Sequence, residues 1–162
     1  MEKKKKIMSW DEYFISLAHL SAFRSKDPNT QVGAVIVDEK NRIVSIGYNG
    51  MPRGCKDNRF PWEREGGFLD TKYAFVVHAE LNAILNSGRP VENCTIYVSL
   101  FPCNECAKAI IQSGIKSVVY ESDKYADTDG VKASKKMLLA AGVTLRQLDF
   151  TVDVTADITE NQ

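Results

Sequence analysis

Strand-like and helix-like segments alternate through the second half of this chain, and this alternation limits the possible folds more than any other feature. The β-rich run "CTIYVSL" is followed by "NECAKAIIQSG", whose helical pattern closes on Gly114, and then by the β-rich "KSVVY". The helical "GVKASKKMLLAAG" and the strand-like "VTLRQL" repeat this unit. Strands joined by helices of this length pair in parallel and bury one face against those helices. The sequence therefore predicts a sheet layered between helices.

The first half of the chain predicts a helix followed by a hairpin. Ser9 and Glu12 have the spacing of a capping box, and apolar residues recur at helical spacing through "WDEYFISLAHLSAF". The β-rich runs "QVGAVIV" and "RIVSIGY" are separated by "DEKN", which is typical of a hairpin. A segment of 28 residues from Gly50 to Val77 has no clear periodicity, and loops of that length are usually functional or mobile. A further helix, "AELNAILNSG", is predicted to close on Gly88.

Composition restricts the functional class. The 162 residues are 44% apolar and 26% charged, which predicts one domain over residues 1–150 and a polar tail over 151–162. A formal net charge of zero gives no electrostatic footprint for nucleic acid. The chain has no apolar run of the length that a membrane span needs, and no apolar signal segment follows "MEKKKK". We therefore expect a cytoplasmic protein that binds neither nucleic acid nor membrane, with cysteines used as ligands, catalytic thiols or core residues.

The segment "FPCNEC" places two cysteines three positions apart, directly after Pro102. If Pro102 opens a helix, Cys103 and Cys106 lie on one face of its first turn, where the helix dipole favours the thiolate that a metal requires. His78 stands where the strand-like "AFVV" gives way to "HAELNAI", and it is the candidate third ligand. Three protein ligands leave the fourth tetrahedral position of zinc for water, as in catalytic zinc sites.

Two other interpretations of the cysteines stay open. A closed structural zinc site would take its fourth ligand from Cys94, Cys55 or His19, and Cys55 with His19 could instead contribute to a second metal site. A redox pair is less favoured, because a thioredoxin-like site has no role for the histidine and glutamate of "HAE".

Glu80 follows His78 by two positions and indicates catalysis. Zinc lowers the pKa of bound water from about 15.7 toward about 7 and so supplies hydroxide at neutral pH. The hydroxide can add to a ring carbon that carries an exocyclic amine. A carboxylate beside the metal, but not bound to it, can move protons from the water to the ring nitrogen and to the departing amine. "HAE" and "PCNEC" match the signature of zinc-dependent nucleobase deaminases.

Over a wider span the sequence resembles the deoxycytidylate deaminases, which convert dCMP to dUMP and ammonia and so supply dUMP for dTMP synthesis. The resemblance runs from about Trp10 to Leu148, through "SKDPNTQVGAVIV", "IGYNGMPRGC", "DTKYAFVVHAELNAI" and "SLFPCNECAKAIIQSGIKSVVY". It implies a zinc-dependent hydrolase with a cytidine-deaminase-like α/β/α sandwich and a five-stranded mixed sheet. It also implies that Asn49 contacts the sugar or base and that the Ala79 N–H faces the pyrimidine carbonyl.

The resemblance carries expectations about regulation and assembly. Members commonly form hexamers, are activated by dCTP and are inhibited by dTTP, so we expect a homo-oligomer with nucleotide effectors. Gly50, Arg53 and Gly54 follow "GYNG" and are candidate effector-sensing residues. Mg²⁺ would accompany a bound triphosphate.

A phosphorylated substrate requires cationic or hydrogen-bonding groups. The candidates in the matched segments are Arg24, Lys26, Arg53 and Lys124, with Asn29 and Tyr125 as further hydrogen-bonding residues. Two alternative functions remain. One is a deaminase that acts on a base within tRNA or single-stranded DNA, against which the zero net charge counts. The other is a zinc-binding module without catalytic activity.

Overall fold

The computed structural model describes residues 6–161 and has a five-stranded sheet at its centre, in the order β2-β1-β3-β4-β5. The strands are β1 (Gly33–Val37), β2 (Ile43–Tyr48), β3 (Thr95–Leu100), β4 (Ser117–Ser122) and β5 (Thr144–Gln147). β2 and β3 both run antiparallel to β1, whereas β3, β4 and β5 run parallel to one another. The predicted mixed sheet with parallel order in its second half is confirmed.

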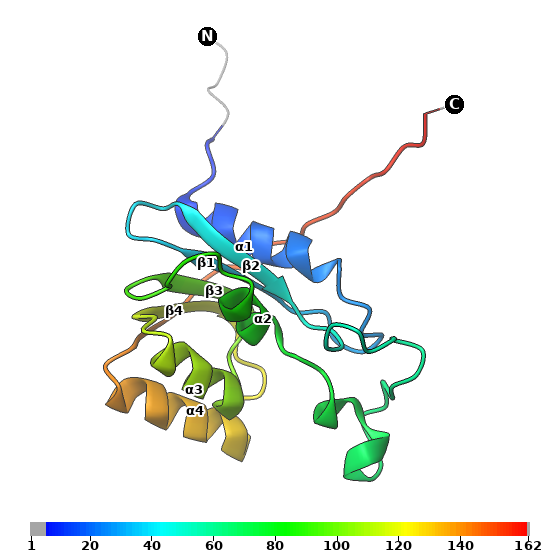
Figure 1. Cartoon of the computed structure of the whole chain (residues 1–162). Coiled ribbons are helices and arrows are strands. Elements are labelled where there is room, and N and C mark those ends of the chain that lie inside the picture. The colour runs from blue at the N-terminus through cyan, green and yellow to red at the C-terminus, as the bar shows by residue number, and fades with distance from the viewer. Residues whose placement is uncertain (1–5, 162) are drawn as a thin grey trace.

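Helices cover both faces of this sheet (Figure 1). α1 (Trp10–Ala22) packs on one face, while α2 (Ala79–Leu85), α3 (Asn104–Gln112) and α4 (Asp129–Ala140) pack on the other. Successive side chains of a strand point to opposite faces. In β1, accordingly, Ile36 packs in the core beneath α2, α3 and α4, whereas Val35 packs with Phe14 of α1. The three-layer α/β/α sandwich expected from the sequence is confirmed.

The local signals at the element ends are mostly confirmed. The Ser9 hydroxyl accepts from the Glu12 N–H while the Glu12 carboxylate accepts from the Ser9 N–H, which is the predicted capping box of α1. β1 and β2 form the predicted antiparallel hairpin. α3 ends just before Gly114, whose φ of 80° is the left-handed conformation that glycine adopts at a helix end.

The predicted end of the second helix is wrong. α2 ends at Leu85 rather than at Gly88. The Ser87 hydroxyl donates to the Arg89 carbonyl, and this local turn precedes Pro90. The residue before a proline is disfavoured in the helical conformation, which keeps Arg89 out of a helix, and the Ser87 turn occupies the chain between Leu85 and Pro90.

The long segment after β2 returns to its starting point. Gly50 and Val77 exchange backbone hydrogen bonds of 3.0 and 2.9 Å, and the loop between them projects from the sheet (Figure 1). It contains two short 3₁₀ turns, Phe68–Asp70 and Lys72–Ala74. This closure places the loop beside the start of α2. None of the helices within residues 6–161 has the length and apolar character needed to cross a membrane.

Candidate active site

Three potential metal ligands meet where α2 and α3 begin. His78 is the N-cap of α2, Cys103 is the N-cap of α3, and Cys106 lies in the first turn of α3. The Nδ1 atom of His78 lies 3.4 Å from the Cys103 Sγ and 3.5 Å from the Cys106 Sγ. Both helices start at one end of the sheet, and this common origin brings together residues 25 and 28 positions apart in the sequence.

The spacing of these atoms fits a zinc ion. Zn–N bonds of about 2.1 Å and Zn–S bonds of about 2.3 Å at a tetrahedral angle separate the nitrogen and sulfur by about 3.6 Å. The observed separations of 3.4 and 3.5 Å are close to this value. His78, Cys103 and Cys106 are thus arranged as three of the four ligands of a tetrahedral site.

No fourth protein ligand joins this group within the described part of the chain. Cys94 is buried in the core beneath α2 and α3, as its position at a strand start suggested. The His19 Nε2 contacts the Glu121 carboxylate at 3.0 Å. Cys55 and His19 belong to no metal-ligand group within residues 6–161, so neither the closed site nor the second metal site is supported.

The three ligand groups interact strongly. The hydrogen bond between His78 and Cys103 raises the pKa of His78 to about 9, against the opposing effect of burial. Hydrogen bonding with Cys106 lowers the pKa of Cys103 to about 4, and the same interaction raises the pKa of Cys106. Negative charge is therefore stabilised on Cys103, and a thiolate is the form of cysteine that binds metal.

Glu80 lies beside the ligands without being one of them. It is the second residue of α2, the residue is only 4% exposed, and its Oε2 lies 3.6 Å from the Cys106 Sγ. Burial raises the pKa of this carboxyl group. A raised pKa makes this carboxyl group a better proton acceptor than an exposed glutamate, as a proton carrier requires.

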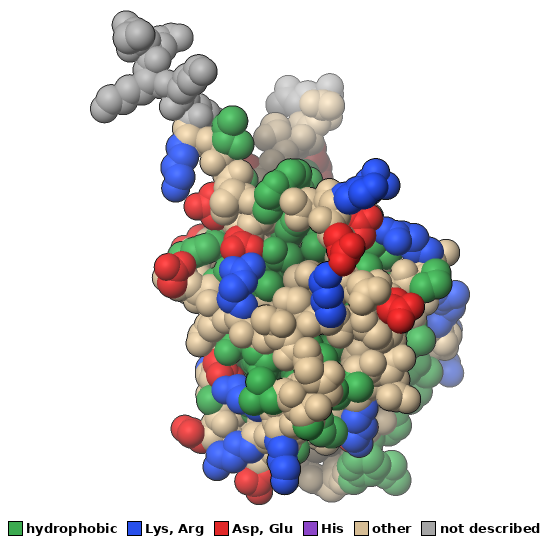
Figure 2. Space-filling view, turned by 90° about the vertical axis from the view of Figure 1, so that its left-hand side faces the viewer, with side chains coloured by type: hydrophobic (Ala, Val, Ile, Leu, Met, Phe, Trp, Pro, Cys, Tyr) green, Lys and Arg blue, Asp and Glu red, His purple; other side chains and the backbone are tan. Residues whose placement is uncertain are grey.

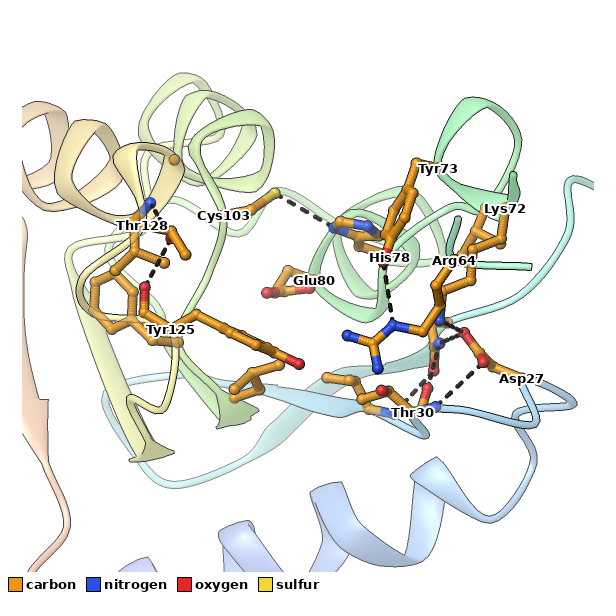
Figure 3. A pocket seen from close by; sticks show the side chains of 17 residues that line it. Asp27, Thr30, Arg64, Lys72, Tyr73, His78, Glu80, Cys103, Tyr125 and Thr128 are labelled. Carbon is orange, nitrogen blue, oxygen red and sulfur yellow. Dashed lines mark hydrogen bonds and ion pairs between the residues drawn. The ribbon is translucent and has the colours of Figure 1, made fainter. Parts of the chain in front are cut away.

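A cavity of about 290 Å³ opens in front of these groups. Its floor contains His78, Glu80 and Cys103, and its walls come from the segment before β1, the long loop and the segment after β4 (Figure 3). This volume suits a small molecule rather than a polymer. The arrangement provides a metal position and a proton carrier at the end of a small-molecule pocket.

The model of the cytidine and deoxycytidylate deaminase zinc-binding region matches residues 8–122, which is most of the chain. The chain belongs to the cytidine and deoxycytidylate deaminase family. It is therefore a zinc-dependent deaminase, a hydrolase. The deoxycytidylate deaminase of Homo sapiens is 56% identical over 148 residues, covering 90% of this chain and 83% of that protein. The one from Mus musculus is 55% identical over the same length.

The fold of this deaminase also matches solved structures. The dCMP deaminase of cyanophage S-TIM5, crystallised with dCMP and dUMP, superposes with a TM-score of 0.68 at 27% identity. The superposition covers 89% of this chain and all of that one.

Asn49 lines the cavity of the deaminase, as expected of a substrate-contacting residue, but its side chain also has internal partners. Its Oδ1 accepts from the Val32 N–H at 2.9 Å, and its Nδ2 donates to the Thr30 carbonyl at 2.9 Å and to Asp27 at 3.3 Å. Asn49 thus fixes the cavity wall. Its predicted contact with the sugar or base stays a prediction.

Only some of the other predicted substrate residues line the cavity. Tyr125 lines the cavity. Asn29 does not, and its side chain instead donates to the Trp62 carbonyl at 2.9 Å, which fastens the long loop to the segment before β1. Ala79 is fully buried at the first position of α2, where the backbone N–H has no partner inside the helix. Its contact with the pyrimidine carbonyl stays a prediction.

Arg24 and Lys26 do not line this cavity. They line a second pocket, of about 260 Å³, together with the predicted effector residues Gly50, Arg53 and Gly54. Lys26 pairs there with Asp57 at 2.6 Å. Asn49 lines both pockets and therefore lies in the wall between them.

Several cavity residues were not singled out from the sequence, namely Asp27, Thr30, Arg64, Lys72 and Tyr73. A signal existed for Asp27 in "SKDPN" and for Lys72 and Tyr73 in "DTKYAFVV", because both segments carry the family resemblance. Arg64 lies in the part of the loop without periodicity, where the sequence offered no such signal.

Proposed function

We propose that this deaminase converts dCMP and water to dUMP and ammonia, with zinc held by His78, Cys103 and Cys106 and with Glu80 as the proton carrier. The observation that carries the proposal is the placement of a buried, non-ligating carboxyl group beside three zinc-type ligands at the floor of a small cavity. The choice of dCMP is supported by the relatives named deoxycytidylate deaminase and by the phage dCMP deaminase structure.

The reaction replaces the exocyclic amine on the pyrimidine ring with the oxygen of water. Zinc, when bound, lowers the pKa of a coordinated water and so provides the nucleophile at neutral pH. Glu80 takes the proton released by the water and gives it to the ring nitrogen beside the attacked carbon. The same carboxyl group then passes the proton of the newly added hydroxyl group to the amine, the carbon–nitrogen bond breaks as the new carbonyl forms, and neutral ammonia departs.

The start of α2 orients the base for this chemistry. The unpaired N–H of Ala79 is one residue from Glu80 and from His78, so a pyrimidine carbonyl bound there would place the ring beside both. Asn49 lines the same cavity, and its amide retains acceptor capacity for a sugar hydroxyl.

The second pocket is suited to a nucleotide effector. It contains three cationic residues, Arg24, Lys26 and Arg53, and the Gly54 backbone with a φ of 87°. Asp57 pairs with Lys26 in the same pocket, so Arg24 and Arg53 are the cations left to meet a triphosphate, and a bound Mg²⁺ would offset part of its remaining charge. We propose that dCTP binds there to activate the enzyme and that dTTP opposes it, with Asn49 in the shared wall linking the two pockets. Such control would suit an enzyme that supplies dUMP for dTMP synthesis.

We propose that the protein assembles as a homo-oligomer, namely a hexamer. Large apolar side chains stay exposed on α1 and just after it, including Trp10 at 57%, Leu20 at 46% and Phe23 at 47%. Such residues are enriched where protein surfaces associate. Size-exclusion chromatography with light scattering tests this assembly.

The alternative of a deaminase acting on tRNA or single-stranded DNA is less well supported. The net charge is zero, and on the face seen in Figure 2 basic and acidic side chains are interspersed. Binding of a nucleic-acid backbone favours a continuous basic groove.

A substrate panel tests the proposal. We expect kcat/KM for dCMP to exceed that for deoxycytidine at least tenfold, with little activity on dCTP, cytosine or an oligonucleotide. Metal analysis of purified protein should give one zinc per chain, reduced in the single alanine variants of His78, Cys103 and Cys106. Equal kcat/KM for dCMP and deoxycytidine would contradict the choice of substrate, and wild-type zinc content in all three variants would contradict the ligand assignment.

A further inference from the structure

Two cationic side chains, Arg64 and Lys72, line the catalytic cavity within the described residues. Both come from the long loop, and neither belongs to the set of cations that the sequence suggested for a phosphate. A nucleoside monophosphate brings close to two negative charges into this cavity. The question is which of the two cations is able to meet them.

Lys72 already has a partner. Its Nζ lies 2.5 Å from the Asp27 Oδ2, and the two side chains are 9% and 1% exposed. Asp27 also accepts from the N–H groups of Asn29 and Thr30 at 2.8 and 3.2 Å. The pair is buried and close to neutral, so Lys72 contributes little free charge to the cavity.

Arg64 has no carboxylate partner within residues 6–161. Its Nε donates to the Tyr73 hydroxyl at 3.4 Å, and its guanidinium points into the cavity toward the side of Glu80 and Tyr125 (Figure 3). The hydrogen bond to Tyr73 raises the pKa of Arg64 further above its ordinary value, so the charge is permanent. The terminal nitrogens remain available for two parallel hydrogen bonds.

We propose that Arg64 binds the 5′-phosphate of the substrate and determines the preference for a nucleotide over a nucleoside. Tyr73 is a positioning residue, because its hydroxyl accepts from the Arg64 Nε and so directs the terminal nitrogens of the guanidinium into the cavity. The Tyr125 hydroxyl, on the opposite wall of the cavity, is the neighbouring donor. This assignment rests on the proposed function, since it takes a phosphorylated pyrimidine as the ligand of the same site.

Arg24 and Lys26 are excluded from this role by their location. Both line the second pocket, and Lys26 is engaged by Asp57. The long loop therefore supplies the phosphate contact, while α2 and α3 supply the chemistry.

The experiment compares kcat/KM for dCMP and for deoxycytidine in Arg64→Gln. We expect the ratio of the two to fall about 100-fold, because two charge-assisted hydrogen bonds are lost with dCMP only. Arg64→Lys keeps the charge but not the planar guanidinium that can form two parallel hydrogen bonds, so the ratio of the two kcat/KM values should fall about tenfold. Tyr73→Phe should raise the KM for dCMP severalfold with little change in kcat.

Arg59→Gln is the matched control, because Arg59 lies in the same loop, is exposed and lines neither pocket.

Each outcome separates the two proposals. A wild-type ratio in Arg64→Gln, with wild-type protein still preferring dCMP, overturns the role of Arg64 and leaves the proposed function standing. A wild-type protein without preference for dCMP overturns the proposed function itself. If Arg64→Gln loses zinc, the test is made with Arg64→Lys instead. A wild-type ratio of kcat/KM for dCMP to that for deoxycytidine in Arg64→Lys would then overturn the inference.

Discussion

The carboxylate of Glu80 approaches the Sγ of Cys106 to 3.6 Å, yet it stays outside the ligand group that Cys106 forms with Cys103 and His78. The two neighbours come from different helices, α2 and α3, whose N-termini meet here. This arrangement separates metal binding from proton transfer, so the two can be removed independently.

Glu80→Gln should therefore fold and retain zinc while losing turnover. The amide has nearly the same shape and can still hydrogen-bond the ring nitrogen, but it cannot carry a proton. General acid and base assistance typically contributes about 10² to 10⁴ in rate, and one group serves both nitrogens here, so we expect a loss toward the upper end. Steady-state kinetics and metal analysis on the same preparation measure both properties.

Glu105→Gln is the matched control for Glu80→Gln. Glu105 also lies in the first turn of a helix, but its side chain is 71% exposed. Its kcat should stay near the wild-type value. A Glu80→Gln protein with full zinc and more than about a tenth of wild-type kcat would refute the mechanism, and loss of zinc would instead identify Glu80 as a ligand.

Gly47 lets β2 approach α2 closely, and a side chain there should disturb the site. A Cβ on Gly47 would lie 2.3 Å from the Ala79 carbonyl oxygen and 2.4 Å from the Ala83 backbone nitrogen. Overpacking of this kind typically costs about 1 to 3 kcal/mol, so Gly47→Ala should lower Tm by about 2 to 12 °C. Calorimetry measures the loss, and reduced zinc content should accompany it, because α2 carries His78.

Gly88→Ala is the control for Gly47→Ala. A Cβ on Gly88 meets nothing within 4 Å, and its Tm should stay within about 2 °C of wild type. Equal stability of the two variants would mean that α2 moves away from β2 without cost.

The metal site was predictable from the sequence because each of its residues is tied to a local signal. Pro102 and the helical pattern fix the start of α3, so the two cysteines fall on one turn whatever the rest of the fold does. His78 and Glu80 are fixed in the same way at the start of α2. The meeting of the two helices is a tertiary fact, and it was anticipated from the match of "HAE" and "PCNEC" to the deaminase signature rather than from local spacing.

The walls of the cavity were harder to predict. Lys72 pairs with Asp27 across 45 positions of sequence, and Arg64 lies in a loop with no periodicity to show which way its side chain points. Arg24 and Lys26 were predicted to bind the substrate phosphate, but they follow the end of α1, where the chain turns, and they line the second pocket instead. Neither helical nor strand periodicity holds there, so their direction into the second pocket could not be read from spacing.

Replacing Lys72 should destabilise the protein strongly. Lys72→Met leaves the Asp27 carboxylate buried with only amide donors, and breaking a buried ion pair from one side costs about 3 to 5 kcal/mol. Lys26→Met is the matched control, because the Lys26 side chain is 68% exposed in its pair with Asp57 and surface pairs contribute at most about 1 kcal/mol. Urea unfolding at pH 7 measures both. Similar losses in the two variants would show that the Lys72 pair is not a structural element of the cavity wall.

Effector control depends on the second pocket. We expect dCMP saturation to be sigmoidal, to become hyperbolic with dCTP, and to be opposed by dTTP. Within the described residues, Arg53 is one of two cations in that pocket without a carboxylate partner, so Arg53→Gln should raise the dCTP concentration for half-activation at least tenfold. Arg59→Gln, outside the pocket, is the control. Rates indifferent to both nucleotides at millimolar concentration would mean that the pocket has another use.

The last prediction concerns acid stability and a contact between α1, β3 and β5. The two carboxylate oxygens of Asp11 accept from the Arg146 guanidinium at 2.7 and 2.8 Å, and one also accepts from the Tyr97 hydroxyl at 2.7 Å. The hydrogen bonds from Arg146 lower the pKa of Asp11 below its ordinary value of 3.8, against the opposing effect of burial. Asp11→Asn at pH 7 should lower the free energy of unfolding by roughly 1 kcal/mol, or about 2 to 4 °C in Tm.

The sign of the pH dependence follows from the lowered pKa of Asp11. Because the unfolded chain binds the proton more tightly than the folded protein, the stabilisation is fully present above about pH 4 and is lost as the pH falls through the folded pKa. The Tm difference between wild type and Asp11→Asn should therefore be largest from pH 5 to 7 and shrink toward pH 3. Zinc loss in acid affects both proteins equally and cancels in the difference. Asp153→Asn, in the exposed part of the tail, should leave the Tm unchanged throughout. A difference between wild type and Asp11→Asn that is the same at pH 3 and pH 7 would show that Asp11 stabilises the fold through packing rather than charge.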